Sequence, residues 1–305
     1  MTEHSRSIEM VEVGPRDGLQ NESVLVSTAH KVELIRRAIA AGSRRIEVAS
    51  FVNPKRVPQM ADAEEVVAQL GPVEGVTRIG LVLNERGAER ALACGLDQLG
   101  AVAIASDPFG IRNQGQESAQ SLEVAERIVA MAKAAGKTAQ VTIAVAFGCP
   151  FGGEVDPAHV VAMAARLAQA GPVEVALADT IGVAVPAQVS HLVREVARVI
   201  APLPVRVHFH NTRNTGIANV WAAVEAGARV VDASIGGLGG CPFAPGAAGN
   251  VASEDVAYML ARSGVATGLD LGQLIETAQW LGGVMDKTMP SMLAKAGPFP
   301  KEPDQ

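Results

Sequence analysis

The sequence predicts an α/β fold, a (β/α)8 TIM barrel with an extra C-terminal helical segment. Short Val- and Ile-rich runs alternate with longer Ala-rich runs of helical period, which is typical of parallel strands joined by helices. Several predicted helices stop at glycine, the residue favoured just beyond a helix C-terminus. Polar residues that interrupt the apolar pattern gather at the strand ends, where the active site of such a barrel lies.

Eight strands are predicted from short apolar runs, because β-branched residues favour an extended backbone. In chain order they span Ile8–Val13, Arg45–Ala49, Arg78–Leu83, Gln98–Ala105, Gln140–Ala146, Val173–Leu177, Val205–His210 and Arg229–Ser234.

Helices are predicted between the strands, where apolar residues recur every three or four positions. They span Ser27–Ala41, Asp62–Leu70, Glu85–Ala93, Ser118–Ala135, Pro157–Ala170, Pro186–Ile200 and Thr215–Ala226, and two more follow the last strand at about Ser253–Arg262 and Leu271–Lys287. Residues 1–287 are therefore expected to form a single catalytic barrel domain that includes the C-terminal helix. Residues 288–305, which are rich in proline, are expected to form a tail.

An open, doubly wound sheet is the alternative fold. Such a sheet normally carries a Gly-rich phosphate-binding turn after its first strand. The segment Gly14–Gly18, which reads Gly-Pro-Arg-Asp-Gly, does not match that turn, so the closed barrel is favoured.

The composition indicates a globular enzyme. The 305 residues are 48% hydrophobic and 19% charged, which is enough for a large buried core. A net charge of −6 without a Lys/Arg-rich run argues against nucleic acid as a partner, and no apolar stretch is long enough to cross a membrane. Three scattered cysteines make no disulfide framework, so a reducing compartment, the cytoplasm, is expected.

Two histidines end the seventh predicted strand. His208 and His210 are two residues apart, so on a strand both imidazoles point to one face, into the barrel mouth. Two such imidazoles make half of a divalent metal site. The alternative is one histidine hydrogen-bonded in the core and the other on the rim.

Arg16 and Asp17 follow the first predicted strand beside turn glycines. The carboxylate is placed to bind a metal, and the neighbouring guanidinium can hold a carbonyl or enolate oxygen. A surface salt bridge at a turn is the structural alternative. Glu47 lies in the β-branched second strand and needs a partner if buried, and Arg16 is the nearest candidate across the barrel.

A glycine-rich loop, residues 236–250, follows the eighth predicted strand. It contains Cys241 and ends at Asn250. We interpret it as a lid that carries a thiol to the substrate, with the amide oxygen of Asn250 returning to the metal. The alternative is a structural turn around an inert cysteine. Asp179, at the end of the sixth strand, is interpreted as an orienter of a metal-bound histidine, a ligand contact or a helix N-cap.

At these residues the chain resembles the 3-hydroxy-3-methylglutaryl-CoA (HMG-CoA) lyases, a family of metal-dependent carbon–carbon lyase barrels. The resemblance runs from about Ile8 to Lys287. It rests on Val11–Glu22, Ser50–Lys55, Val57–Met60, Asp179–Gly182 and the Gly/Cys loop that closes on Asn250.

The resemblance implies a site for Mg²⁺ or Mn²⁺ whose four ligands are Asp17, His208, His210 and Asn250. Two nitrogen and two oxygen donors with open positions suit a chelating hydroxy-carboxylate substrate.

The resemblance also implies roles for residues around the metal. Arg16 matches the arginine that stabilises the enolate of the leaving acetyl-CoA, and Cys241 matches the lid cysteine that takes part in proton transfer. Gln20, Glu47, Asp179 and Glu254 fall at positions that contact the substrate or support the site.

One stretch departs from the family. Residues 211–216 read Asn-Thr-Arg-Asn-Thr-Gly where the lyases read Asp-Thr-Tyr-Gly-Gln-Ala. These residues lie just beyond the metal ligands, so the departure concerns the identity of the substrate. If Arg213 recognises an additional anionic group, the substrate carries another carboxylate.

The implied reaction is cleavage of HMG-CoA, or a close 3-hydroxyacyl-CoA, to acetyl-CoA and a keto acid, which for HMG-CoA is acetoacetate, a step of leucine degradation. Asp17 or His208 is expected to act as the base. The alternatives are a lyase for citramalyl-CoA or a longer-branched glutaryl-CoA, a synthase that condenses acetyl-CoA with a 2-oxo acid, and a non-catalytic barrel. The expected partners are an acyl-CoA thioester and further copies of the chain, in a homodimer or higher oligomer.

Overall fold

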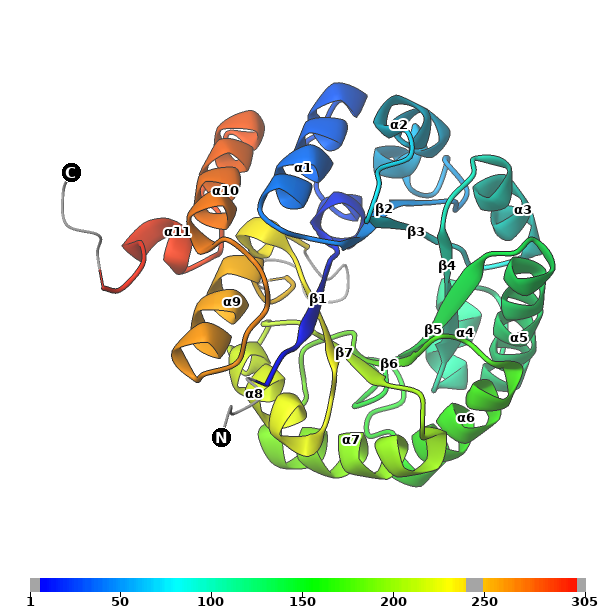
Figure 1. Ribbon diagram of the computed structural model, residues 1–305. Helices are drawn as coiled ribbons and strands as arrows, with labels where there is room; N and C mark the ends of the chain where they lie inside the picture. Colours follow the sequence, from blue (N-terminus) through cyan, green and yellow to red (C-terminus); the bar gives the residue numbers. More distant parts are fainter. Residues whose placement is uncertain (1–5, 240–248, 301–305) are drawn as a thin grey trace.

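The predicted barrel is confirmed by a computed structural model, which describes residues 6–239 and 249–300. Within them, eight parallel strands close into a ring in chain order, because β1 pairs with both β2 and β8 (Figure 1). The strands are β1 (Glu9–Glu12), β2 (Arg45–Ser50), β3 (Thr77–Leu81), β4 (Gln98–Ile104), β5 (Thr138–Ala144), β6 (Val175–Asp179), β7 (Val205–Phe209) and β8 (Val230–Ala233).

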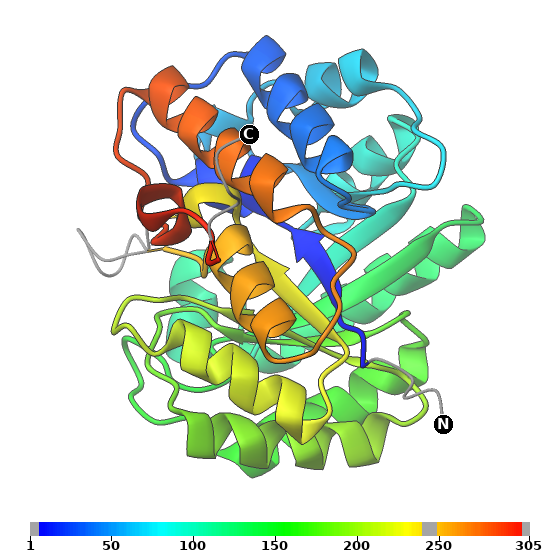
Figure 2. The ribbon, with the colours of Figure 1, turned by 60° about the vertical axis from the view of Figure 1, so that its left-hand side comes forward.

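A ring of helices surrounds the strands. It consists of α1 (Thr28–Ala40), α2 (Ala63–Leu70), α3 (Glu85–Ala93), α4 (Asp107–Asn113), α5 (Ser118–Ala134), α6 (Pro157–Ala170), α7 (Pro186–Ile200), α8 (Gly216–Ala226), α9 (Ser253–Arg262), α10 (Leu271–Met285) and α11 (Leu293–Ala296). The extra helix α10 lies between α9 and α1 and completes the ring (Figures 1 and 2). None of the described helices combines the length and the apolar character needed to span a bilayer.

Besides α11, four short helical segments were not predicted. Helix α4 begins after Ser106 with Pro108 in its first turn and lies between β4 and α5. The others are a π-helix, η1 (Gly14–Gly18), and two 3-10 helices, η2 (Pro58–Met60) and η3 (Ile235–Gly237). All four are seven residues or shorter, too short to show helical periodicity in the sequence.

The C-terminal segment is attached to the barrel. Helix α11 lies inside the stretch expected to be a tail, Ser291 is buried, and the backbone amides of Met292 and Leu293 donate to Asp255 on α9. The described part of this segment therefore packs on the domain.

The strands separate two environments. Outward-facing side chains such as Ile46, Val207 and Phe209 belong to one large apolar core between strands and helices. The barrel interior instead holds buried charges, among them Arg206, Glu47 and Asp232. Because successive strand residues alternate in direction, Arg206, Glu47 and Asp232 lie on the inner face while their neighbours along the strands pack outward.

Candidate active site

Strand β7 and the residue that follows it place three polar side chains on the inner face of the barrel. Arg206 lies deep in the barrel, and His208 and His210 follow toward the mouth, each two residues beyond the last. The strand ends one residue earlier than predicted, because His210 leaves the sheet and pairs with Asn250. Both imidazoles nevertheless project to the same side, and their ring centroids are 5.1 Å apart.

Asp17 meets the two histidines from the other side of the barrel mouth. Its Oδ2 lies 3.8 Å from Nε2 of His208 and 3.7 Å from Nε2 of His210. The π-helix η1 presents it there, and glycine is needed in that segment because a Cβ on Gly14 would lie 2.5 Å from Oε1 of Glu12. One carboxylate oxygen and two imidazole nitrogens, all within 4.8 Å of one another, form a possible site for a divalent cation.

The orientation of His208 is fixed by Asp232 on β8. The carboxylate Oδ2 lies 3.1 Å from Nδ1 of His208, which leaves Nε2 facing the cluster. A carboxylate behind a histidine in this way is a usual support of a metal ligand. Asp232 was not predicted from the sequence, although a lone acid within the apolar run Val230–Ala233 is the same kind of signal that identified Glu47.

Arg16 is held by two anions, one of them the predicted partner. Its Nε lies 2.7 Å and its Nη2 2.5 Å from Oε2 of Glu47, and its Nη1 lies 2.5 Å from Oδ1 of Asp17. These bonds use three of the five guanidinium N–H groups, so two remain to face a ligand.

Electrostatics keep the cluster charged. Burial would raise the pKa of Asp17, but Arg16 and the two histidines hold it well below its usual range. Burial would lower the pKa of His208, and the carboxylates of Asp232 and Asp17 outweigh it, so this pKa is raised. The ionised carboxylate is the form that binds a cation.

Asn250 is also brought to the cluster. Its Nδ2 donates to Oδ2 of Asp17 at 2.8 Å and to the Leu238 carbonyl at 3.0 Å. The chain is so close here that a Cβ on Gly239, whose φ is +120°, would lie 2.4 Å from that Nδ2. Cys241, the expected lid cysteine, lies outside the described residues.

Gln20 and Glu254, which were both predicted to contact the substrate or support the site, lie in different places. Gln20 lines the cavity and accepts a hydrogen bond from Ser50 at 3.1 Å. Glu254 lies on α9, where both carboxylate oxygens accept from the backbone N–H of Gly236 at 3.1 and 3.2 Å. Glu254 therefore supports the base of the loop after β8.

Asp179 and Arg213 lie behind the cavity. Asp179 shares the outward face of β6 with Val175 and Leu177, and it accepts from two backbone amides of the loop before α7, at 2.9 and 3.0 Å. Of the three roles predicted for Asp179, these contacts match that of a residue that caps backbone N–H groups near the start of a helix. Arg213 donates to the carbonyls of Ile181 and Gly182, both at 3.0 Å, and does not line the cavity.

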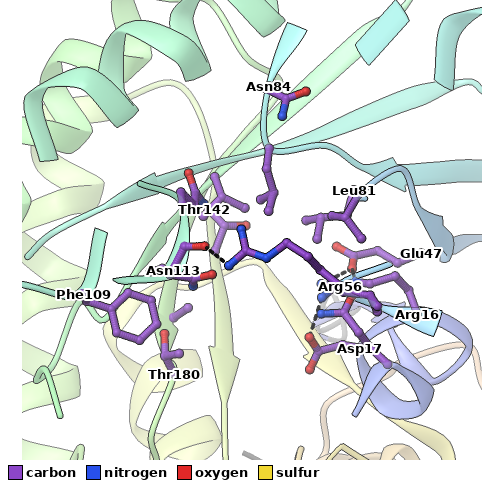
Figure 3. A pocket seen from close by; sticks show the side chains of 18 of the residues that line it. Arg16, Asp17, Glu47, Arg56, Leu81, Asn84, Phe109, Asn113, Thr142 and Thr180 are labelled. Carbon is purple, nitrogen blue, oxygen red and sulfur yellow. Dashed lines mark hydrogen bonds and ion pairs between the residues drawn. The ribbon is translucent and has the colours of Figure 1, made fainter. Parts of the chain in front are cut away.

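A cavity of about 670 Å³ opens over the cluster, a usual size for a small-molecule site. Arg16, Asp17, His208 and His210 form the side of the cavity that lies next to the cluster. Its far side is formed by strands β3 to β5, by the end of α4 and by the loop after β2 (Figure 3).

Comparison with known proteins identifies the family. The HMGL-like family model matches residues 7–281. An (R)-citramalyl-CoA lyase of Chloroflexus aurantiacus is 44% identical over 96% of this chain and 95% of its own length. A 3-hydroxy-3-isohexenylglutaryl-CoA/hydroxymethylglutaryl-CoA lyase of Pseudomonas aeruginosa is 41% identical over 95% and 97%.

A solved structure agrees with these relatives. The HMG-CoA lyase of Acinetobacter baumannii, in complex with coenzyme A and 3-methylmalate, superposes with a TM-score of 0.93 at 39% identity, and each chain is covered completely. The barrel, the cluster at its mouth and these matches together show that the chain belongs to the HMG-CoA lyase family and is a carbon–carbon lyase.

Proposed function

We propose that the protein cleaves HMG-CoA, or a closely related 3-hydroxyacyl-CoA, to acetyl-CoA and a keto acid in a reaction that needs a divalent cation. The observation that carries the proposal is the convergence of Asp17, His208 and His210 beside Arg16. Asp17, His208, His210 and Asn250 would hold Mg²⁺ or Mn²⁺. When bound, the cation supplies Lewis-acid polarisation of the hydroxyl and carboxylate oxygens of the substrate.

The protein's own residues account for the movement of protons and charge. Asp17 or His208 accepts the proton of the C3 hydroxyl, and the bond between C2 and C3 then breaks. The electron pair of that bond forms the enolate of acetyl-CoA, whose oxygen faces the two remaining N–H groups of Arg16. Cys241, directly or through water, returns a proton to the enolate carbon.

A second substrate has support of its own. Citramalyl-CoA bears its carboxylate directly on C3, so the same cleavage yields acetyl-CoA and pyruvate. The 44% identity to a citramalyl-CoA lyase favours it as the alternative to HMG-CoA.

The experiment is a direct comparison of kcat/KM for HMG-CoA and (R)-citramalyl-CoA, with acetoacetate and pyruvate identified by mass. Protein treated with a chelator should be inactive and should regain activity with Mg²⁺ or Mn²⁺. Full activity after chelation would contradict the cation requirement. Condensation of acetyl-CoA with a 2-oxo acid, without cleavage of either thioester, would replace the lyase reaction by a synthase reaction.

A further inference from the structure

The cavity is lined by a second arginine, Arg56, whose guanidinium points toward the end of α4. Arg56 belongs to the loop after β2, and Figure 3 shows its guanidinium extending across the cavity toward Asn113 and Thr142. Thr142 lies on β5, which is opposite β1 in the eight-stranded ring, and Asp17 follows β1. The guanidinium of Arg56 is therefore directed away from the β1 side of the cavity, where Arg16 and Asp17 lie.

The acids of the cavity are all engaged elsewhere. Asp17 pairs with Arg16, and Glu47 pairs with Arg16 and Arg206. Asp232 pairs with Arg206, and Glu85 pairs with Arg127 on the outside of the barrel. Within residues 6–239 and 249–300, no carboxylate forms an ion pair with Arg56.

Among the described residues, the Arg56 guanidinium makes one hydrogen bond, and it is long. Nη2 donates to the carbonyl oxygen of Asn113 at 3.5 Å, which is weak by the usual geometry. Most of the N–H groups of this guanidinium are therefore available to a ligand.

The loop that carries Arg56 is ordered by its own hydrogen bonds. The backbone N–H groups of Arg56 and Val57 donate to the Asn53 carbonyl at 2.9 and 3.1 Å, and that of Lys55 donates to Oδ1 of Asn53 at 3.0 Å. Just beyond, the buried Gln59 donates to the Val24 carbonyl at 2.8 Å. The guanidinium is thus presented by a segment that is held at both ends.

We propose that Arg56 is a specificity-determining residue that binds an anionic group of the thioester substrate on the side of the cavity away from Asp17, His208 and His210. The group is a carboxylate of the acyl chain or a phosphate of CoA, since a guanidinium recognises both through paired N–H donors. Arg56 thus takes the part that the sequence suggested for Arg213. The inference rests on the proposed acyl-CoA substrate.

Binding measurements on the full chain with Mn²⁺ test the inference. Arg56→Gln removes the charge, and Arg56→Lys keeps it without the paired donors. Arg36→Gln is the matched control, because Arg36 is also exposed and also donates to one carbonyl at 3.5 Å, that of Gln69, but lies on α1 outside the cavity. The probes are CoA, which carries the phosphates alone, and glutaryl-pantetheine, which carries an acyl carboxylate without phosphates.

We expect Arg56→Gln to raise the Kd of one probe by about 10- to 100-fold, the loss of one charge-assisted contact, while Arg36→Gln changes neither. A rise for CoA assigns the phosphate, and a rise for glutaryl-pantetheine assigns the carboxylate. Arg56→Lys should fall between the wild type and Arg56→Gln. Unchanged Kd values for both probes in Arg56→Gln would overturn the inference.

The failure of this inference is distinguishable from that of the proposed function. If the wild type cleaves a thioester and Arg56→Gln has the same KM and Kd values, Arg56 has no role and the lyase reaction stands. If no thioester is cleaved but Arg56→Gln weakens binding, the anion site stands and the proposed reaction fails. If the wild type cleaves a thioester and Arg56 binds its anionic group, KM should rise in Arg56→Gln with little change in kcat. That pattern is the signature of an interaction made equally in the ground state and the transition state.

Discussion

Arg16 is a cation whose position is fixed by Glu47 and Asp17 and whose free N–H groups face the cavity. Donors that are already aimed at developing negative charge need no reorganisation during the reaction. Arg16→Met keeps the length of the side chain and removes these donors. We expect kcat to fall roughly 10²- to 10³-fold with a much smaller change in KM, measured on the better of the two substrates. A normal kcat would reduce Arg16 to a structural ion pair.

Asp232 contacts His208, one of the three clustered residues, through Nδ1 of its imidazole. Asp232→Asn keeps the size of the side chain but removes the charge that holds Nδ1 of His208, so the imidazole loses its fixed orientation. We expect the affinity for Mn²⁺, measured by calorimetry, to fall about 10- to 100-fold. Asp97→Asn is the control, because Asp97 is likewise paired with an arginine, Arg78, but away from the cavity. Equal Mn²⁺ affinity in both variants would leave Asp232 without a role in the metal site.

The sequence predicts residues at strand ends better than residues inside strands. Asp17, His208 and His210 stand out because polar groups end otherwise apolar runs, and the structure brings them together. Asp232 and Arg206 were missed because the strand bounds alone do not say which face points inward. The direction of Asp179 was equally unpredictable from the strand bounds. It lies on the outer face of β6 and bonds to the loop before α7.

Among the elements, the loop after β8 depends on two buried carboxylates. Glu12, at the end of β1, accepts from the backbone of Ile235 at 3.0 Å and from the hydroxyl of Ser253 at 2.6 Å. Glu254 on α9 accepts from Gly236. Burial raises the pKa of each glutamate to about 7, with hydrogen bonds opposing the shift. Elements η3 and α9 are thus joined by acids that the fold keeps partly protonated.

The raised pKa values predict how stability depends on pH. Between about pH 4.5, where a glutamate of the unfolded chain titrates, and pH 7, the folded state binds more protons, so the free energy of unfolding falls as pH rises. Glu254→Gln removes one titrating group, and we expect a smaller fall in the urea midpoint between pH 5 and pH 8. The raised pKa of His208 acts in the same direction, so the comparison is made between variants. Glu123→Gln, exposed on α5, is the control; a slope as steep in Glu254→Gln as in this control would contradict the prediction.

The order of the elements follows from the sequence, while the details around the site do not. Helices α3, α6, α7 and α9 have the predicted bounds, because apolar periodicity marks them, and α3 and α6 also begin after capping side chains, Asn84 and Asp156. The π-helix η1 was expected to be a turn, since its five residues are shaped by the packing of the strand ends around it. Local propensity does not contain that information.

Across the whole molecule, the barrel interior is held by a continuous chain of opposite charges. Arg206 on β7 reaches Glu47 on β2 at 3.0 Å, Glu174 before β6 at 3.2 Å and Asp232 on β8 at 2.5 Å. Glu174 in turn pairs with Arg45 at 2.6 Å. The centre of the ring is thus joined by ion pairs between strands far apart in the sequence, and Glu47 and Asp232 extend the chain to the residues of the active site.

Removing the central cation tests how much the fold depends on this network. Burial would lower the pKa of Arg206, but its three carboxylate partners raise it, so the guanidinium stays charged with none of its side chain exposed to solvent. Arg206→Met leaves each carboxylate buried with one partner fewer, and loss of one member of a buried ion pair costs about 3–5 kcal/mol. We expect urea unfolding to show a loss of that size, while Arg166→Met on α6, which breaks a solvent-exposed pair with Glu126, should stay within about 1 kcal/mol of wild type. If both variants are equally stable, the carboxylates are satisfied by Arg16, Arg45 and His208 alone, and Arg206 is not needed to hold the strands together.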